Sequence, residues 1–159
     1  MGCTKPNVVD FNEINIFDET LLIRQHNYYR SRHNCPDLKI SKELSEMATE
    51  YAKQLLDSKT PIFSSHTYKG QVLGENIFNS EQKINIEKVC NKWYEEHKNY
   101  KYNINKFQKG TNHFTQLIWK KSELIGFGLS SNENKFYLVV YYFPAGNVFG
   151  EFDNNVPTP

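Results

Sequence analysis

The sequence predicts an α/β (α+β) fold, a three-layer α-β-α sandwich whose central sheet is mainly antiparallel. Two observations lead to this prediction. Apolar residues recur at helical spacing through residues 44–55, the strongest amphipathic pattern in the chain. Residues 137–142 are nearly all apolar, which is typical of a central strand covered on both faces. Helices before and between the strands would supply the two outer layers.

The length of 159 residues fits one domain. Residues 1–15 are polar and rich in asparagine, and they predict a short N-terminal tail. Residues 16–150 predict the single domain. Residues 151–159 contain two prolines at their end and predict a C-terminal tail.

The first helices are predicted from their caps. Asp18 can cap a helix that runs to about residue 33, because Asn34 and Pro36 follow it. Ser41 can cap the second helix, because its hydroxyl can accept the first free N–H groups. A third helix is expected over residues 86–100.

Three strands are expected after the second helix. Residues 75–79 predict a short strand. Residues 124–130 and 136–143 predict a β-hairpin, with an Asn-rich turn between them.

Composition limits the classes of function. Basic residues number 19 and acidic residues 18, so the net charge of +1 gives no case for a nucleic-acid partner. No apolar run approaches the ~20 residues of a membrane span. Cys3, Cys35 and Cys90 cannot form a closed disulfide set, so we expect free thiols in a reducing compartment. Residues 1–20 lack the apolar segment of a secretory signal.

The N-terminus suggests lipidation. Removal of Met1 would expose Gly2, the residue type that accepts a myristoyl chain, and Cys3 could accept a palmitoyl chain. Two chains would anchor the protein firmly, whereas one gives marginal binding. Pro6 stands where the motif requires a hydroxyl, and the alternative is an ordinary N-terminus.

Residues 112–122 combine a histidine with large apolar side chains. If this stretch forms a short helix, Phe114, Leu117 and Ile118 make up its apolar face. Thr111 or Asn112 can cap this helix. His113 would lie in its first turn, where the helix dipole favours the neutral imidazole that binds metal or accepts a proton. The alternative is a histidine that fills a polar gap in the core.

Three further residues are candidates for the same site. Glu96 shares a helical face with Trp93, where a carboxylate needs either an ion-pair partner or a histidine. Glu75 follows Gly74 at the start of a strand, and the alternative is a turn carboxylate bound to backbone N–H groups. His66 lies in a loop after the second helix, where a surface histidine is the simpler interpretation.

Five motifs in this order resemble the CAP superfamily, which comprises the cysteine-rich secretory, antigen 5 and pathogenesis-related 1 proteins. The resemblance covers roughly residues 16–150 and rests on His26-Asn27 with Tyr29-Arg30, Gly74-Glu75-Asn76-Ile77, Trp93-Tyr94, His113-Phe114-Thr115-Gln116-Leu117-Ile118-Trp119 and Tyr142-Phe143-Pro144-Ala145-Gly146-Asn147. It implies the family's α-β-α sandwich. The lack of paired cysteines and the Met1-Gly2 start resemble the intracellular, myristoylated branch of the family, which implies the cytoplasmic face of endomembranes such as the Golgi. Secretion by a route without a signal peptide is the alternative.

In that family two histidines and two acids line a central cleft, and by motif position they match His66, Glu75, Glu96 and His113. His66 and His113 could bind Zn²⁺ weakly, since two ligands are fewer than the three of most catalytic zinc sites. Glu75 and Glu96 could orient the imidazoles or a bound water. The resemblance implies no general enzymatic activity.

A hydrolase using the same cleft is the alternative function. Glu75 or Glu96 would act as the base toward a metal-bound water. A serine nucleophile would have to come from Ser64, Ser65 or Ser80.

A lysine-rich segment suggests a membrane-surface module. Between Lys98 and Ser122 the chain has no acid but carries six lysines, namely Lys98, Lys101, Lys106, Lys109, Lys120 and Lys121. Each could add about 1 kcal/mol of binding to an anionic bilayer if it faces the lipid. The alternative is a solvated loop whose charges point in several directions. A protein partner or a homodimer is a further expectation.

Overall fold

The computed structural model describes residues 11–58 and 66–159. Gly2, Cys3, Ser64 and Ser65 therefore lie outside the described residues. The central sheet has the strand order β1 (Lys39–Ile40), β5 (Leu124–Ser131), β6 (Phe136–Phe143) and β4 (Gly74–Ser80). Only the β1–β5 pair is parallel among the described strands of this sheet, so the predicted mainly antiparallel sheet is confirmed. Strands β2 (Thr67–Tyr68) and β3 (Gln71–Val72) form a separate two-stranded hairpin.

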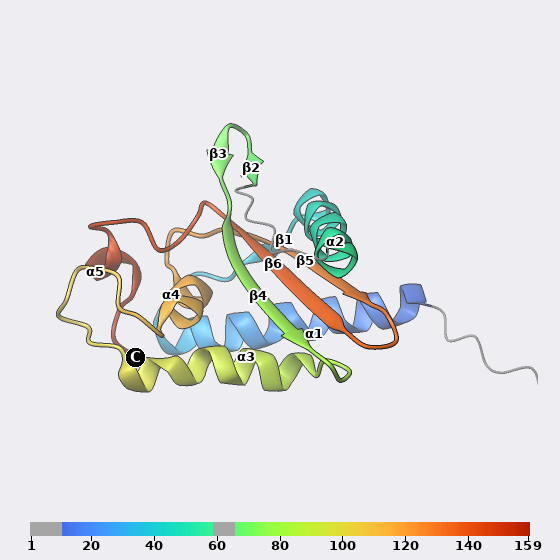
Figure 1. The fold of residues 1–159 in the computed structure, drawn as a ribbon. Helices are drawn as coiled ribbons and strands as arrows, with labels where there is room; N and C mark the ends of the chain where they lie inside the picture. The colour runs from blue at the N-terminus through green and yellow to red at the C-terminus, as the bar shows by residue number, and fades with distance from the viewer. Residues whose placement is uncertain (1–10, 59–65) are drawn as a thin grey trace, which may run out of the picture.

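Helices cover both faces of the sheet (Figure 1). One face packs on α2 (Lys42–Asp57). The other faces α1 (Phe11–Arg32), α3 (Ile86–Glu95) and α4 (Asn112–Ile118). The predicted α-β-α sandwich is therefore confirmed.

Strand β6 shows why the apolar run over residues 137–142 is needed. Side chains alternate across a strand, so successive residues enter the two different cores. Val139 and Tyr141 belong to the core under α2, whereas Val140 and Tyr142 belong to the core under α1, α3 and α4. A strand with two buried faces has no polar side.

Helix α2 lies unusually close to β5 because two glycines of the strand leave room for it. A Cβ added at Gly126 would collide with Leu44, and one at Gly128 would collide with the backbone of Ala48. Ser41 caps α2 as predicted, since its hydroxyl oxygen accepts a hydrogen bond of 3.3 Å from the Leu44 N–H. Local sequence signals thus place this helix correctly.

Helix α1 begins at Phe11, so Asp18 lies within the helix and the prediction that it caps the helix is wrong. No glycine or proline occurs between residues 11 and 33, so no residue stops the helix from extending toward the N-terminus. Helix α3 ends at Glu95, and the chain continues as a tighter 3-10 turn, η1 (Glu96–Asn99). The predicted third helix is therefore two elements.

The last residues of the chain pack against the domain. They contain α5 (Phe152–Asn155), and both Phe152 and Val156 are buried. The Phe152 ring meets Trp119 edge to face, with 5.2 Å between centroids. Residues 151–159, which the sequence suggests are a tail, thus complete one of the two cores.

Arg30 ties α1 to the end of α4. Its guanidinium is fully buried and donates to backbone carbonyl oxygens, among them those of Pro36 (2.7 Å), Trp119 (2.8 Å) and Ser122 (3.1 Å). The carbonyl of Leu117 within α4 accepts a further bond of 3.2 Å. A positive charge at this end also complements the helix dipole. Within residues 11–58 and 66–159, no helix is long and apolar enough to cross a membrane.

Candidate functional site

Glu96 and His113 form a direct pair. A carboxylate oxygen of Glu96 lies 2.7 Å from His113 Nδ1, and the other accepts a 2.9 Å hydrogen bond from the Phe114 N–H. Glu96 begins η1, so the end of α3 delivers this carboxylate to the start of α4. Of the partners that the sequence left open for Glu96, an ion-pair partner or a histidine, the structure has the histidine.

The carboxylate of Glu96 also caps α4, which corrects the prediction that Thr111 or Asn112 does so. Thr111 occupies the capping position, but its hydroxyl donates to the Gln108 carbonyl instead (2.6 Å). A carboxylate is a strong acceptor for the free N–H groups at a helix start, and its charge complements the dipole there.

Two further contacts hold His113, one to its imidazole and one to its backbone carbonyl. It stacks on Trp93 with an angle of 7° between the rings and 5.6 Å between centroids. The Asn76 amide donates to the His113 carbonyl (3.1 Å). Because a carboxylate accepts at Nδ1, that nitrogen carries a proton, and Nε2 is the ring nitrogen left for a ligand.

His66 belongs to a second group, on the α2 side of the sheet. Its Nδ1 lies 2.7 Å from the Tyr141 hydroxyl, and its ring lies 4.4 Å from that of Tyr51. Partial burial lowers the pKa of His66, so its imidazole is neutral at pH 7. Burial and the nearby charge of Glu75 raise the pKa of Tyr141, which keeps that hydroxyl protonated.

Glu75 lies on the same face as Tyr141, because the two residues are direct partners across the β4–β6 ladder. Its side chain reaches solvent, yet the surrounding protein removes part of its hydration and raises its pKa. The next residue, Asn76, faces the other side and contacts His113. Two consecutive residues of the edge strand β4 thus lie near the two histidines. Glu75 is the strand partner of Tyr141, which bonds to His66, and Asn76 bonds to His113.

The structure therefore arranges the four predicted residues as two groups. Glu96 is bonded to His113, while Glu75 and His66 both lie against Tyr141. In the described part of the chain, no three His, Cys, Asp or Glu side chains come together in a way that could hold a metal ion. The two imidazoles offer fewer ligands than a three-ligand zinc site needs.

Sequence reasoning missed the polar residues that support the site. The Tyr142 hydroxyl lies 2.6 Å from Nε2 of the buried His26, and Asn76 donates to the same hydroxyl (3.3 Å). Tyr141 and Tyr142 stand in an apolar run and look like core residues. Their hydroxyl groups were the signal that could have identified them, since a buried tyrosine hydroxyl usually requires a hydrogen-bonding partner.

The six predicted lysines are all exposed, but they differ in their contacts. Lys98 pairs with Glu95, and Lys121 pairs with Glu151 at 3.1 Å. Residues 100–111, the lysine loop, carry Lys101, Lys106 and Lys109. None of the ion pairs found among the described residues involves these three lysines or Lys120.

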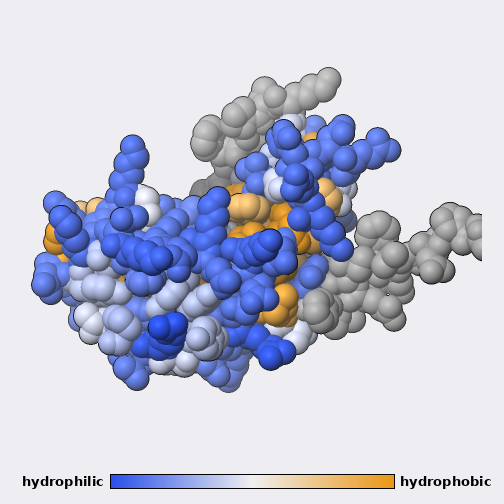
Figure 2. Space-filling view, turned by 90° about the horizontal axis from the view of Figure 1, so that it is seen from below, coloured by the Kyte–Doolittle hydropathy of each residue, from blue (hydrophilic) through white to orange (hydrophobic). Residues whose placement is uncertain are grey.

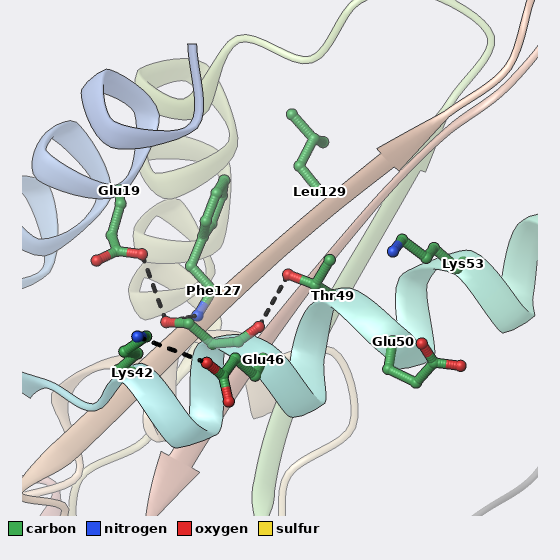
Figure 3. Close-up of a pocket in the computed structure, with 9 residues that line it drawn as sticks. Glu19, Lys42, Glu46, Thr49, Glu50, Lys53, Phe127 and Leu129 are labelled. Atoms are coloured by element: carbon green, nitrogen blue, oxygen red, sulfur yellow. Dashed lines mark hydrogen bonds and ion pairs between the residues drawn. The ribbon is translucent and has the colours of Figure 1, made fainter. Parts of the chain in front are cut away.

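An open cavity of about 500 Å³ lies elsewhere, between α1 and α2 above β5 (Figure 3). Phe127 and Leu129 form its apolar part, and Glu19 and Lys53 are among the charged residues around it. The face of the molecule seen in Figure 2 is mostly hydrophilic, with hydrophobic residues gathered mainly in one area among polar side chains. None of the residues predicted for the site lines this cavity.

The fold is an α-β-α sandwich. It has two histidines near its edge strand, one of them bonded to a glutamate, and this arrangement is that of a CAP-type protein. The profile of the Cysteine-rich secretory protein family matches residues 23–143, which is most of the chain. This chain belongs to the CAP family, and the resemblance inferred from its motifs is confirmed.

Curated relatives agree with this assignment. The human Golgi-associated plant pathogenesis-related protein 1 is 36% identical over 141 residues, which cover 87% of this chain and 91% of that protein. Protein PRY2 of Saccharomyces cerevisiae is 31% identical over 143 residues, 86% of this chain but 40% of that protein.

Solved structures share the fold. The crystal structure of NaASP2 with Zn²⁺ has a TM-score of 0.65 at 22% identity and covers 99% of this chain and 90% of that one. The hookworm platelet inhibitor has a TM-score of 0.67 at 18% identity and covers 99% and 82%.

Proposed function

We propose that this protein is a non-catalytic CAP module that binds anionic membrane surfaces through its lysine loop. The observation that carries the proposal is the exposure of Lys101, Lys106 and Lys109 on one short loop. No acid occurs between residues 97 and 122 to neutralise them locally. Each lysine near an anionic bilayer would contribute about 1 kcal/mol.

The charge that supports this function is local. The whole chain carries a net charge of only +1, so overall attraction to an anionic surface is weak. Lys98 and Lys121 are already paired with carboxylates, and exposed pairs of this kind are weak enough for lipid to compete. Binding should therefore depend on which lysines are present more than on the total charge.

The location follows from the same proposal. One relative is named as Golgi-associated, and we place this protein on the cytoplasmic face of endomembranes, with secretion without a signal peptide as the alternative. Acylation of Gly2, with or without Cys3, would supply a second membrane signal, because one weak signal alone gives reversible binding. A second copy of the chain or another protein partner stays a prediction.

The test is sedimentation with vesicles of phosphatidylcholine, with and without phosphatidylserine. Wild-type protein should bind the anionic vesicles at low salt and dissociate at high salt. The triple variant Lys101→Glu, Lys106→Glu and Lys109→Glu should lose this binding.

The matched control is Lys39→Glu, Lys53→Glu and Lys135→Glu, which makes the same change in net charge at exposed lysines elsewhere. The control should still bind, because its lysine loop is intact. Equal loss in both variants would mean that total charge decides binding. No binding by the wild type at low salt would refute the function.

A second proposal is weak binding of a divalent metal such as Zn²⁺ by His113 and His66. The observation that favours it is the Glu96 carboxylate at His113 Nδ1, an arrangement that orients metal-binding histidines. Titration of Zn²⁺, followed by the imidazole resonances, should show a change at His113 that His113→Ala removes. His97→Ala is the control, and an equal response in that variant would point to nonspecific binding.

The geometry gives less support to a hydrolase. Both oxygens of Glu96 are occupied, one by His113 and one by the Phe114 N–H, so Glu96 orients the imidazole. Ser80 lies four residues beyond Asn76 on β4, a distance of about 13 Å along a strand, which is outside hydrogen-bonding reach of His113. If the site is catalytic, ester or peptide turnover should fall by orders of magnitude in His113→Ala.

A further inference from the structure

We propose that an apolar tip, made of Phe107 on the lysine loop and of Val148 and Phe149 at the same end of the molecule, inserts into the apolar layer of the bilayer. This inference rests on the proposed membrane function and adds a second, hydrophobic mode of contact. The partner is an anionic lipid surface, with the lysines at the headgroups and the tip below them.

The tip residues stand out by their exposure. Phe149 is 91% exposed, Phe107 56% and Val148 40%. Where the exposure of side chains is described, over residues 18–58 and 66–159, only Tyr28, Ile40 and Val72 are other large hydrophobics of comparable exposure. Apolar groups that gather on a surface usually mark a site of interaction.

The two segments that carry the tip are bonded to each other. The Asn105 amide donates to the Gly150 carbonyl (2.9 Å), and its oxygen accepts from the Asp153 N–H (3.2 Å). Figure 1 shows the loop after η1 beside α5 at one end of the molecule. Phe107 and Phe149 therefore lie at the same end, although 42 positions separate them in the chain.

Internal hydrogen bonds hold both segments in shape. The Gln108 side chain accepts from the Lys101 N–H (2.9 Å) and donates to the Lys101 carbonyl (2.8 Å), which closes the lysine loop. The Glu151 N–H donates to the Val148 carbonyl (3.1 Å) and forms a turn that presents Phe149. Phe149 is thus exposed on a turn whose backbone is held by a hydrogen bond.

Charge around the tip favours a lipid surface as the occupant. Lys106 directly precedes Phe107, and Lys101 and Lys109 are exposed on the same loop. Two acids, Glu151 and Asp153, lie close to Phe149 in the chain. The charge of Glu151 is already paired with that of Lys121. Aromatic side chains flanked by lysines match the boundary between headgroups and acyl chains.

The test is a fluorescent probe of depth. Trp93 and Trp119 are both buried and are the only tryptophans in the sequence, so Phe149→Trp adds an exposed one. With phosphatidylserine vesicles, emission of this variant should shift to the blue, and lipids with brominated acyl chains should quench it. The matched control is Val72→Trp on β3, where the native side chain is 55% exposed, and it should show neither effect.

A second variant measures the contribution of the tip. Phe107→Ser with Phe149→Ser should keep the low-salt binding that the lysines provide. At physiological salt, where the lysines are screened, its affinity should fall about tenfold. Both positions are exposed, so thermal unfolding should match the wild type.

The outcomes separate the two proposals. Vesicle binding without quenching of Phe149→Trp would overturn insertion and leave the lysine-based function intact. Absence of any wild-type binding would overturn both. A blue shift that depends on protein concentration without lipid would show that a second copy covers the tip, and would also overturn insertion.

Discussion

His26 is a histidine whose charge state is controlled by burial. It is fully buried on α1, where Nδ1 lies 2.9 Å from the Leu22 carbonyl and Nε2 lies 2.6 Å from the Tyr142 hydroxyl. Loss of hydration lowers the pKa of His26 to about 4. The imidazole is therefore neutral in the folded protein, and its two nitrogens connect α1 to the central strand.

The free energy of unfolding should fall as the pH drops from about 6.5 to about 4. In this window the unfolded chain binds a proton at His26 and the folded chain does not, so acid favours unfolding. The difference in pKa corresponds to about 3 kcal/mol from this one side chain. Urea unfolding at a series of pH values measures it.

The control is the variant His26→Gln, which cannot titrate in this range. Its stability should depend less on pH over the same window, because only the other titrating groups contribute. An unchanged pH dependence would show that His26 is not the residue responsible.

The residues of the candidate site could be named from the sequence, but their contacts could not. His113 stands in a motif, and Glu96 lies on a helical face where a carboxylate needs a partner. The Tyr141 hydroxyl that meets His66 is 75 positions away in the chain, within a run that looks like pure core. Long-range polar contacts leave no local pattern in a sequence.

The contact between α2 and β5 depends on glycine. At Gly128 a Cβ would overlap the backbone of Ala48, and a backbone cannot rotate away as a flexible side chain can. Gly128→Ala should therefore lower the free energy of unfolding by about 3 kcal/mol, at the upper end of the usual cost of overpacking. Chemical denaturation measures the change.

Ser131→Ala, at the exposed end of the same strand, is the control for that change. It should alter stability by less than about 0.5 kcal/mol. A similar loss in both variants would mean that the strand tolerates no substitution, and that close packing on α2 is not the cause.

The elements that the sequence predicted well carry their own signals. Helix α2 has a serine cap and a continuous apolar face, and the β5–β6 hairpin has an Asn-rich turn. Helix α5 spans only four residues and has no side-chain cap. It is held by the packing of Phe152 on Trp119, which is a tertiary contact that no local rule contains.

At the scale of the whole molecule, the C-terminal segment joins parts that are distant in the chain. The Lys120 N–H donates to the Asn155 carbonyl (3.0 Å), and the Pro157 carbonyl lies 2.7 Å from His33 Nδ1 on the residue after α1. Residues 152–157 thus connect the loop after α4 to the end of the first helix.

Truncation after Glu151 should destabilise the protein by about 4 kcal/mol. It removes the buried Phe152 and Val156, and it exposes the ring of Trp119. Thermal unfolding and a red shift of tryptophan emission would report the loss. Removal of only Thr158 and Pro159, which are exposed, should change neither the unfolding temperature nor the tryptophan emission. Equal stability of the two truncations would show that the segment contributes nothing.

Helix α4 has seven residues, fewer than the roughly 12 that an isolated helix needs in water. A free peptide of residues 111–119 would be a coil. The helix exists because Glu96 from the end of α3 holds its first turn and Arg30 from α1 holds its last. The position of His113 is therefore a joint property of three segments, and a substitution at Arg30, on the far side of α4, would change the resonances of this imidazole.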